Sequence, residues 1–168
     1  MELADILAER AVLCCTGVTT KRQLFEDLSE RAAELTGFPV ADILGAITSR
    51  EELGSTGLGN GIAIPHGKLT GLKEVTALFA RLDHPIEFDA VDDQPVDLVV
   101  MLLAPTGAGA DHLKALSRVA RLLRTEAVVD ELRRLDDPAR LRAVLTAPLL
   151  SVIVYSNVSV PEKPALGL

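Results

Sequence analysis

One run of residues, 96–103 (VDLVVMLL), constrains the fold more than any other part of this 168-residue chain. It is almost continuously apolar and rich in β-branched side chains, a pattern typical of a strand that is buried on both faces of a sheet. Such a strand needs a layer of helices on each side. We therefore expect an α/β fold in a single domain, with a small mixed β-sheet flanked by helices on both faces.

Strand-like and helix-like patterns alternate along the rest of the chain, as an α/β layer fold requires. Strands are expected at residues 11–15, 62–64, 75–82 and 96–103. Helices are expected at residues 2–8, between a cap at Thr19 or Thr20 and Gly37, and at residues 40–53, 112–123, 127–135 and 138–145.

Prolines and polar residues predict where two of the strands end. The Pro65-His66-Gly67 segment is expected to end the strand at 62–64, which places His66 at the tip of that strand. Residues 83–85 (DHP) are expected to form a turn after the strand at 75–82.

The long helix after the buried strand is expected to begin at a polar cap. Asp111 or a neighbouring residue would cap it, so that His112 lies in its first turn. Its inward face is expected to be formed by Leu113, Leu116, Val119, Ala120 and Leu123.

Composition limits the classes of function that the chain can have. The formal net charge is −7 and aromatic residues make up only 3% of the chain, so a phosphate-binding basic stripe and base stacking are both unfavoured. We expect no nucleic-acid partner. The adjacent Cys14 and Cys15 fit neither a disulfide framework nor a zinc site, and no apolar run is long enough to span a bilayer. A cytoplasmic protein without a membrane span is expected.

The stretch at residues 50–68 (REELGSTGLGNGIAIPHGK) is the strongest candidate for a functional site. Its glycines invite a nucleotide-binding interpretation, but a P-loop needs Lys-Ser/Thr directly after its last glycine, and Gly61 is followed by Ile-Ala-Ile. The segment at 54–57 (GSTG) is not a nucleophile elbow either. The histidines lack the H-x-x-x-H or H-x-H spacing of a metal site, so no metal and no cofactor are expected.

Histidine chemistry remains. An imidazole is largely neutral at physiological pH, since its ordinary pKa is about 6.5, and a ring nitrogen can then attack phosphorus directly. Arg50, the backbone amides of residues 54–61 and His112 are groups that could neutralise phosphoryl oxygens. A structural role for His66, a solvated position for Arg50 and a surface position for His112 stay open on these grounds.

The 50–68 stretch resembles the active-site signature of the enzyme IIA domains of the fructose and mannitol class, in the bacterial phosphoenolpyruvate-dependent phosphotransferase system. The similarity is greatest to the stand-alone nitrogen-regulatory members. Further matches at residues 85–105 (PIEFDAVDDQPVDLVVMLLAP) and 112–123 (HLKALSRVARLL) extend the resemblance over residues 2–147. Residues 148–168 would form a C-terminal tail of unknown role, as an edge strand, a dimer contact or a segment lying on the body.

The resemblance implies roles for individual residues. His66 would accept a phosphoryl group from a histidine-containing carrier protein, with Arg50 and His112 in support. The phosphoryl-site loop would comprise Ser55, Thr56, Gly57, Gly59, Asn60 and Gly61.

Two classes of function follow from this resemblance, and a third is left open. The first is a regulatory phosphocarrier whose two states bind different targets, such as ion-transport regulators or sensor kinases. The second is a sugar-transport component that passes its phosphoryl group to a cysteine of a separate fructose- or mannitol-type enzyme IIB. The third is a binding module that is not phosphorylated.

Overall fold

The computed structural model describes residues 1–15 and 17–148. In chain order the elements are α1 (Leu3–Ile6), a 3-10 turn η1 (Glu9–Ala11), β1 (Val12–Cys15), α2 (Lys21–Thr36), α3 (Val40–Glu52), β2 (Gly57–Gly59), β3 (Ile62–Ala63), β4 (His66–Leu69), β5 (Thr76–Ile86), β6 (Val96–Pro105), α4 (Gly109–Leu123), α5 (Glu126–Arg134) and α6 (Pro138–Thr146). The predicted α/β class is confirmed. The interpretations of residues 149–168 lie outside the described residues.

The sheet is mixed and is built around β6. Its strand order is β1-β5-β6-β3-β2, and β4 also pairs with β6. β6 is antiparallel to β5 on one side and parallel to β3 and β4 on the other. All residues of β6 except Asp97 and Pro105 are buried, as the sequence pattern predicts.

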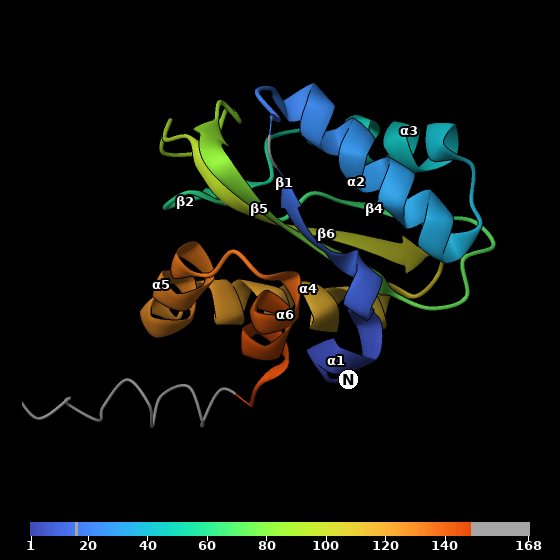
Figure 1. Cartoon of the computed structure of the whole chain (residues 1–168). Coiled ribbons are helices and arrows are strands. Elements are labelled where there is room, and N and C mark those ends of the chain that lie inside the picture. The colour runs from blue at the N-terminus through green and yellow to red at the C-terminus, as the bar shows by residue number, and fades with distance from the viewer. Residues whose placement is uncertain (16, 149–168) are drawn as a thin grey trace, which may run out of the picture.

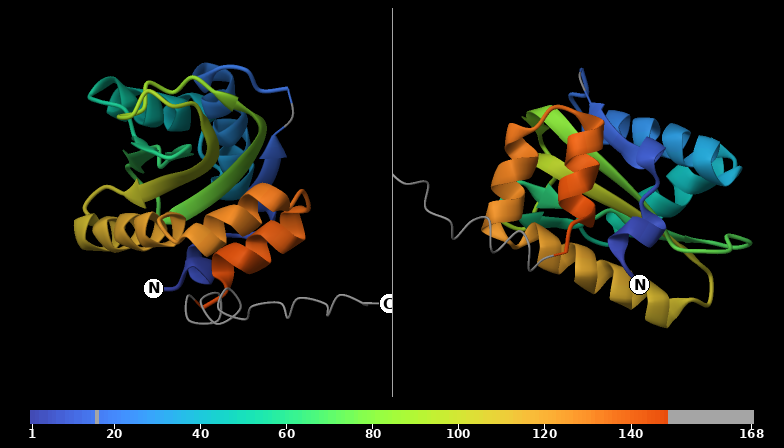
Figure 2. Two further views of the ribbon diagram at one scale, coloured as in Figure 1. Left: turned by 90° about the vertical axis from the view of Figure 1, so that its left-hand side faces the viewer. Right: turned by 60° about the horizontal axis from the view of Figure 1, so that its bottom comes forward.

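Helices cover both faces of this sheet. α2 and α3 lie on one face, and α4, α5 and α6 lie on the other together with the short α1 (Figures 1 and 2). The largest fully buried side chains come from α2, α3, β5 and β6 and from the residues just after α1 and β5: Phe79, Phe88, Leu7, Leu24, Leu28, Ile43, Ile47, Leu78, Leu98, Met101, Leu102 and Leu103. This core fixes the positions of α3 and α4, the two helices that border the site described below.

The ends of α2 show how local sequence sets the boundaries of a helix. Thr20 is the N-cap, and its side-chain oxygen accepts a hydrogen bond from the backbone N–H of Gln23 at 3.1 Å. Gly37 ends the helix in the left-handed region, with φ of 77°, and donates its N–H to the carbonyl of Ala33. Both boundaries agree with the sequence prediction.

The strand before Pro65 ends as predicted, at Ala63, but His66 is not at its tip; it is the first residue of the next strand, β4. β3 and β4 both pair with β6, and every paired residue in them lies opposite the residue 36 positions later. They therefore form one strand in a single register with a break between them. The interruption falls at Ile64 and Pro65, because proline has no N–H to donate to a ladder. The carbonyl of Pro65 still accepts from Leu102 N at 3.0 Å, which carries the register across the gap.

The predicted turn at residues 83–85 is also wrong, since β5 continues through them to Ile86. The pairing with β6 shifts register between Arg81 and Ile86, which is the mark of a bulge. A bulge tolerates Pro85 because residues there do not have to donate to the neighbouring strand. The segment GLG at 57–59, expected to be loop, forms the edge strand β2.

Helix α4 begins earlier than predicted, and its inward face agrees with the prediction at Leu116, Val119, Ala120 and Leu123 but not at Leu113. Ala108 is the N-cap residue, and Asp111 lies within the first turn. The buried stripe starts at His112, which is 6% exposed, whereas the neighbouring Leu113 is 67% exposed and does not point inward. Residues three, seven and ten positions after His112 continue the buried stripe: Ala115, Val119 and Leu122.

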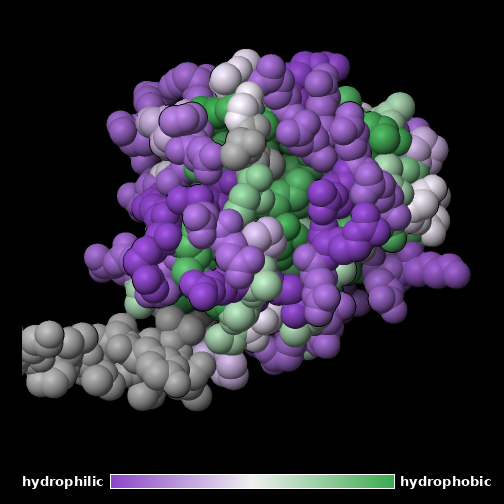
Figure 3. Space-filling view, viewed as in Figure 1, coloured by the Kyte–Doolittle hydropathy of each residue, from purple (hydrophilic) through white to green (hydrophobic). Residues whose placement is uncertain are grey.

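The surface is mostly polar. On the face shown in Figure 3, hydrophilic residues surround a narrow apolar strip along the middle, where β1 forms the edge of the sheet. Among the described residues no helix is both long and apolar enough to cross a membrane.

Candidate phosphoryl-transfer site

A cavity of about 630 Å³ lies beside β4, between α3 and α4. Three residues that the sequence singled out line it together: Arg50 from the last turn of α3, His66 from the start of β4, and His112 from α4. The remaining lining residues are Ala46, Ser49, Leu53, Gly67, Lys68, Gly109, Leu113 and Leu116. The fold therefore brings side chains up to 62 positions apart in sequence, Arg50 and His112, to one space.

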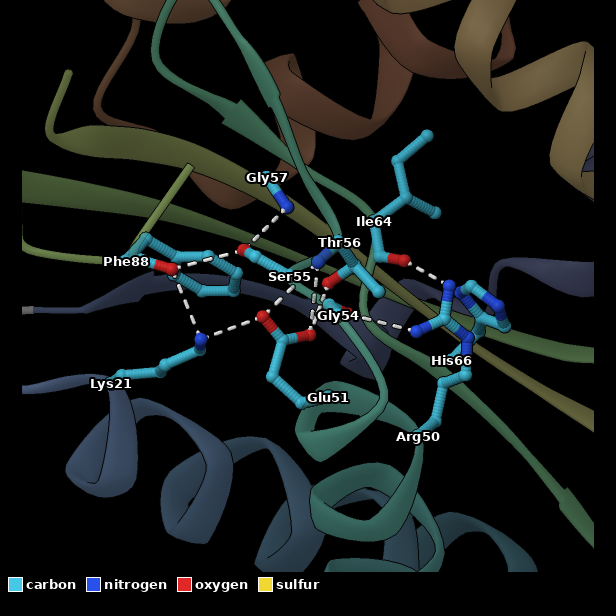
Figure 4. A network of polar contacts seen from close by, with 10 residues as sticks. All are labelled: Lys21, Arg50, Glu51, Gly54, Ser55, Thr56, Gly57, Ile64, His66 and Phe88. Carbon is cyan, nitrogen blue, oxygen red and sulfur yellow. Dashed lines mark hydrogen bonds and ion pairs between the residues drawn. The ribbon is translucent and has the colours of Figure 1, made fainter. Parts of the chain in front are cut away.

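The ring of His66 is held in one tautomer. Its Nδ1 lies 2.8 Å from the carbonyl oxygen of Ile64 (Figure 4). A carbonyl can only accept, so Nδ1 carries the proton and donates it, and Nε2 keeps its lone pair. The Ile64 carbonyl is available because the strand is interrupted at Pro65.

The environment of His66 favours the neutral ring. Burial lowers the pKa of His66 below its ordinary value, and the positive charge of Arg50 lowers it further. The hydrogen bond to Ile64 and the negative charge of Glu51 act in the opposite direction without overcoming these effects. At neutral pH the ring is uncharged, which is the form that a nitrogen nucleophile needs.

His112 meets His66 edge to face. Their ring centroids are 5.4 Å apart and the ring planes are inclined by 73°. Nε2 of His112 is buried and has no hydrogen-bond partner among residues 1–15 and 17–148. Burial lowers the pKa of His112, and the neighbouring His66 and Lys68 lower it further. A buried ring nitrogen without a partner is available to a polar group that enters this cavity.

Arg50 is held at the cavity by the loop that follows α3. Its Nη1 donates to the carbonyl of Gly54 at 2.9 Å, and this bond folds the side chain back toward the end of its own helix. The guanidinium lies near His66 in Figure 4. Arg50 thus places a positive charge at the cavity that His66 lines, where it can bind an anion.

Three of the predicted loop residues stand behind the site instead of lining it. Ser55 Oγ donates to the carbonyl of Phe88 at 3.0 Å and accepts from the N–H of Gly57 at 3.1 Å. Thr56 is bound through its N–H and its hydroxyl to the carboxylate of Glu51. These residues connect α3 to the sheet.

Gly59, Asn60 and Gly61 lie elsewhere. Gly59 and Asn60 line a second cavity, of about 500 Å³, which α4 and α5 border. There Arg133 donates to the carbonyl of Asn60 at 2.6 Å and to the carboxylate of Asp97. None of the three contributes to the cavity of His66.

Sequence reasoning missed two charged residues near the site. Glu51 and Lys68 lie within the glycine-rich stretch, next to Arg50 and close to His66, but nothing in their spacing distinguishes them from solvated charges. Lys68 lines the cavity, and Glu51 contacts the loop behind it. No group of three or more His, Cys, Asp or Glu side chains is placed to hold a metal ion in the part of the chain that the structure describes.

Fold and site together define the class of protein. The family model described as "Phosphoenolpyruvate-dependent sugar phosphotransferase system, EIIA 2" matches residues 5–147, and the chain belongs to this family. Its relatives include the "Nitrogen regulatory protein" of Bradyrhizobium diazoefficiens, which is 49% identical over 148 residues, 88% of this chain and 97% of that protein. The "Nitrogen regulatory protein" of Escherichia coli is 37% identical over 147 residues, 87% of this chain and 90% of that protein.

Solved structures agree with this assignment. The nitrogen regulatory protein IIA-Ntr from Neisseria meningitidis superposes with a TM-score of 0.81 at 35% identity, covering 86% of this chain and 99% of that one. The mannitol enzyme IIA of Escherichia coli, in a complex with phosphorylated enzyme IIB, has a TM-score of 0.70 at 18% identity, covering 83% and 98%. The second comparison shows the shared fold. The resemblance to nitrogen-regulatory enzyme IIA proteins is confirmed.

Proposed function

We propose that this protein is a phosphohistidine carrier of a nitrogen-regulatory phosphotransferase system, with His66 as the acceptor. One observation carries the proposal: the hydrogen bond from Nδ1 of His66 to Ile64, which leaves Nε2 as an unprotonated nucleophile inside a cavity that also holds Arg50 and His112. The donor is a phosphorylated histidine-containing carrier protein. The cytoplasmic location expected for such an exchange belongs to the same proposal.

The transfer step follows from the tautomer. The lone pair on Nε2 of His66 attacks phosphorus, an Nε2–P bond forms, and the N–P bond of the donor histidine breaks and returns its electron pair to the donor ring. No proton has to leave His66 during the attack. Positive charge develops on its ring, and the carbonyl of Ile64 stabilises that charge through the Nδ1–H donor.

Arg50 and His112 then act on the phosphoryl oxygens. The guanidinium of Arg50 supplies fixed positive charge, and the buried Nε2 of His112 supplies a donor when Nδ1 of that ring is the unprotonated nitrogen. Phosphorylation adds negative charge to a chain whose net charge is already −7. Partner proteins, such as ion-transport regulators or sensor kinases, distinguish the two forms by this difference.

The decisive experiment is phosphorylation with enzyme I, the carrier protein and labelled phosphoenolpyruvate. The wild-type protein is expected to be labelled and His66→Ala is not, with the label mapped to Nε2. Equal labelling of both proteins would remove His66 from the mechanism. An unlabelled wild-type protein would instead favour the non-phosphorylated binding module.

A second assay separates the regulatory carrier from a sugar-transport enzyme IIA. The labelled phosphoprotein is mixed with purified fructose- and mannitol-type enzyme IIB proteins, and the loss of label from His66 is followed with time. We expect the label to stay on His66. Rapid transfer to a cysteine of enzyme IIB would decide for the transport role.

A further inference from the structure

We propose that Glu51 is a positioning residue for the phosphoryl site: together with Lys21 it clamps the segment at residues 54–56, and this segment orients both His66 and Arg50. The kinetic part of this inference rests on the proposed function. The structural part, which concerns the tautomer of His66 in the unmodified protein, can be tested without it.

The carboxylate of Glu51 is buried, and its polar contacts with the described residues are all to donors. Its side chain is only 7% exposed. It receives the ammonium of Lys21 at 2.6 Å, the hydroxyl of Thr56 at 2.5 Å, and the N–H of Thr56 at 3.1 and 3.2 Å to its two oxygens (Figure 4). Lys21 belongs to α2, Thr56 to the loop and Glu51 itself to α3, so this carboxylate ties three segments together.

Lys21 is itself fixed on two further sides. Its Nζ donates to the carbonyl of Phe88 at 3.0 Å and lies 4.4 Å from the centroid of the Phe88 ring. The Phe88 carbonyl also receives the hydroxyl of Ser55. Two sets of hydrogen bonds therefore hold the loop. Thr56 donates to Glu51, and Ser55 donates to the same Phe88 carbonyl as Lys21.

Stability alone is a weak reason for such an ion pair. Taking two charges out of water costs free energy that their attraction often does not exceed, and apolar side chains can serve as well. Burial disfavours the charged form of Glu51, but Lys21 and Thr56 outweigh it and lower the pKa of the carboxyl group. The carboxylate thus stays ionised and can only accept hydrogen bonds. Both donors of Thr56 are bound to it, which restricts Thr56 to one position.

Two short paths lead from this clamp to the site. The carbonyl of Thr56 accepts from the N–H of Ile64 at 3.1 Å, and Ile64 is the residue whose carbonyl fixes the ring of His66. The carbonyl of Gly54, two residues before Thr56, accepts from Arg50. A shift of Thr56 therefore displaces the partner of the nucleophile and the partner of the cation together.

The test replaces Glu51 by glutamine, which keeps the shape but puts an amide NH₂ where one of the donors must be accepted. Proton-coupled ¹⁵N spectra of the unmodified protein report the tautomer of His66. We expect Nδ1–H alone in the wild type and a mixture of tautomers in Glu51→Gln. Labelling is expected to slow about 10- to 100-fold in kcat, with the KM for the carrier protein unchanged within about twofold.

A second pair of variants at Thr56 keeps the proposal testable where Glu51→Gln fails to fold. Thr56→Val has the shape of threonine without the hydroxyl, and we expect the same direction of change with a smaller size. Thr56→Ser keeps the hydroxyl and loses a methyl group, and should restore both the tautomer and the rate. A residue that only fills space would give the opposite order.

Asp97→Asn is the matched control. It removes a partly buried carboxylate from an ion pair with Arg133 that does not line the cavity of His66, so it should lower stability without changing the tautomer or the rate. A wild-type tautomer in both Glu51→Gln and Thr56→Val overturns the proposal, as does an equal slowing in Asp97→Asn. If wild type is not labelled at all, the proposed function fails while the spectra still decide the role of Glu51.

Discussion

The two nitrogens of the His66 ring have different tasks. Nδ1 donates to Ile64 within the chain, and Nε2 keeps the lone pair that the proposed transfer uses. His66 could be named as a candidate from the sequence, because it is the single histidine of the 50–68 stretch, which resembles the family's active-site signature. Its tautomer could not, since it depends on the carbonyl that an interrupted strand releases.

Replacing Arg50 by alanine should slow phosphorylation about 10- to 1000-fold, because it removes fixed positive charge that faces the phosphoryl oxygens. The pKa of His66 should rise in this variant, since Arg50 contributes to its lowering. Rapid-quench labelling measures the first effect and a ring-proton NMR titration the second. Arg22→Ala, on an exposed i,i+4 pair with Glu26, is the control and should change neither. An unchanged pKa and rate in Arg50→Ala would contradict the assigned position of the guanidinium.

His112 shows the limit of periodicity arguments. Val119 and Leu123 of the predicted inward face are buried, and Leu116 and Ala120 pack against the core, but Leu113 is exposed and His112 is buried instead. Where the buried stripe starts depends on the neighbouring sheet, information that a single helix does not contain.

The close packing of α3 against β4 depends on one small residue, Gly67. A Cβ atom at Gly67 would lie 3.1 Å from the Cβ and the carbonyl carbon of Ala46, which is closer than ordinary packing allows. Glycine at this position lets the helix that carries Arg50 approach the strand that carries His66. The sequence does not show which helix packs against Gly67, because that contact joins residues distant along the chain.

Gly67→Ala should therefore destabilise the fold by about 1–3 kcal/mol, the usual cost of overpacking, and should also slow labelling as α3 moves away. Gly45→Ala is a matched control in α3, the helix that packs against Gly67, because a Cβ added at Gly45 meets nothing within 4 Å. It should stabilise the helix by about 0.5–1 kcal/mol. Chemical denaturation measures both variants. Equal effects would mean that the helix and strand are not in close contact at Gly67.

At the scale of the whole molecule, α6 supplies the last buried core side chains of the part of the chain that the structure describes. Leu141 and Leu145 of α6 are buried, and the family model ends at residue 147. A protein truncated after Pro148 should fold, with a melting temperature within about 4 °C of the full chain, and should be labelled at the same rate. Thermal melting and the labelling assay test this. Loss of either property would show that residues 149–168 belong to the domain, contrary to the predicted boundary.

Stability should depend on pH through the two histidines of the site. Burial lowers the pKa of both in the folded protein, so below the ordinary value of about 6.5 the unfolded chain binds more protons. The free energy of unfolding should then fall as the pH drops below about 6.5, by at most about 1.4 kcal/mol per pH unit for each histidine. Denaturation at a series of pH values measures this. A double variant, His66→Asn with His112→Asn, should have a flatter profile, and an identical slope would contradict the shifts.

The large-scale architecture was the most predictable part. A strand as continuously apolar as β6 must be buried on both faces, which places it in the middle of a sheet that helices cover on each side. Strand order and the long reach of β5 were not predictable, because they follow from pairings between residues distant in sequence, such as the register of β3 and β4 against β6.

The unpaired nitrogen of His112 bears on the lifetime of the phosphorylated form as well as on the rate of phosphorylation. Among the described residues it has no partner, and a buried polar group in that condition costs about 1–3 kcal/mol. If an oxygen of the phosphoryl group forms a hydrogen bond with this nitrogen, the phosphorylated protein is stabilised relative to the unmodified protein. The contact that helps the group to arrive then also delays its departure, so the lifetime of the loaded form, and with it the duration of the message, is set in part by one histidine that never carries the phosphate.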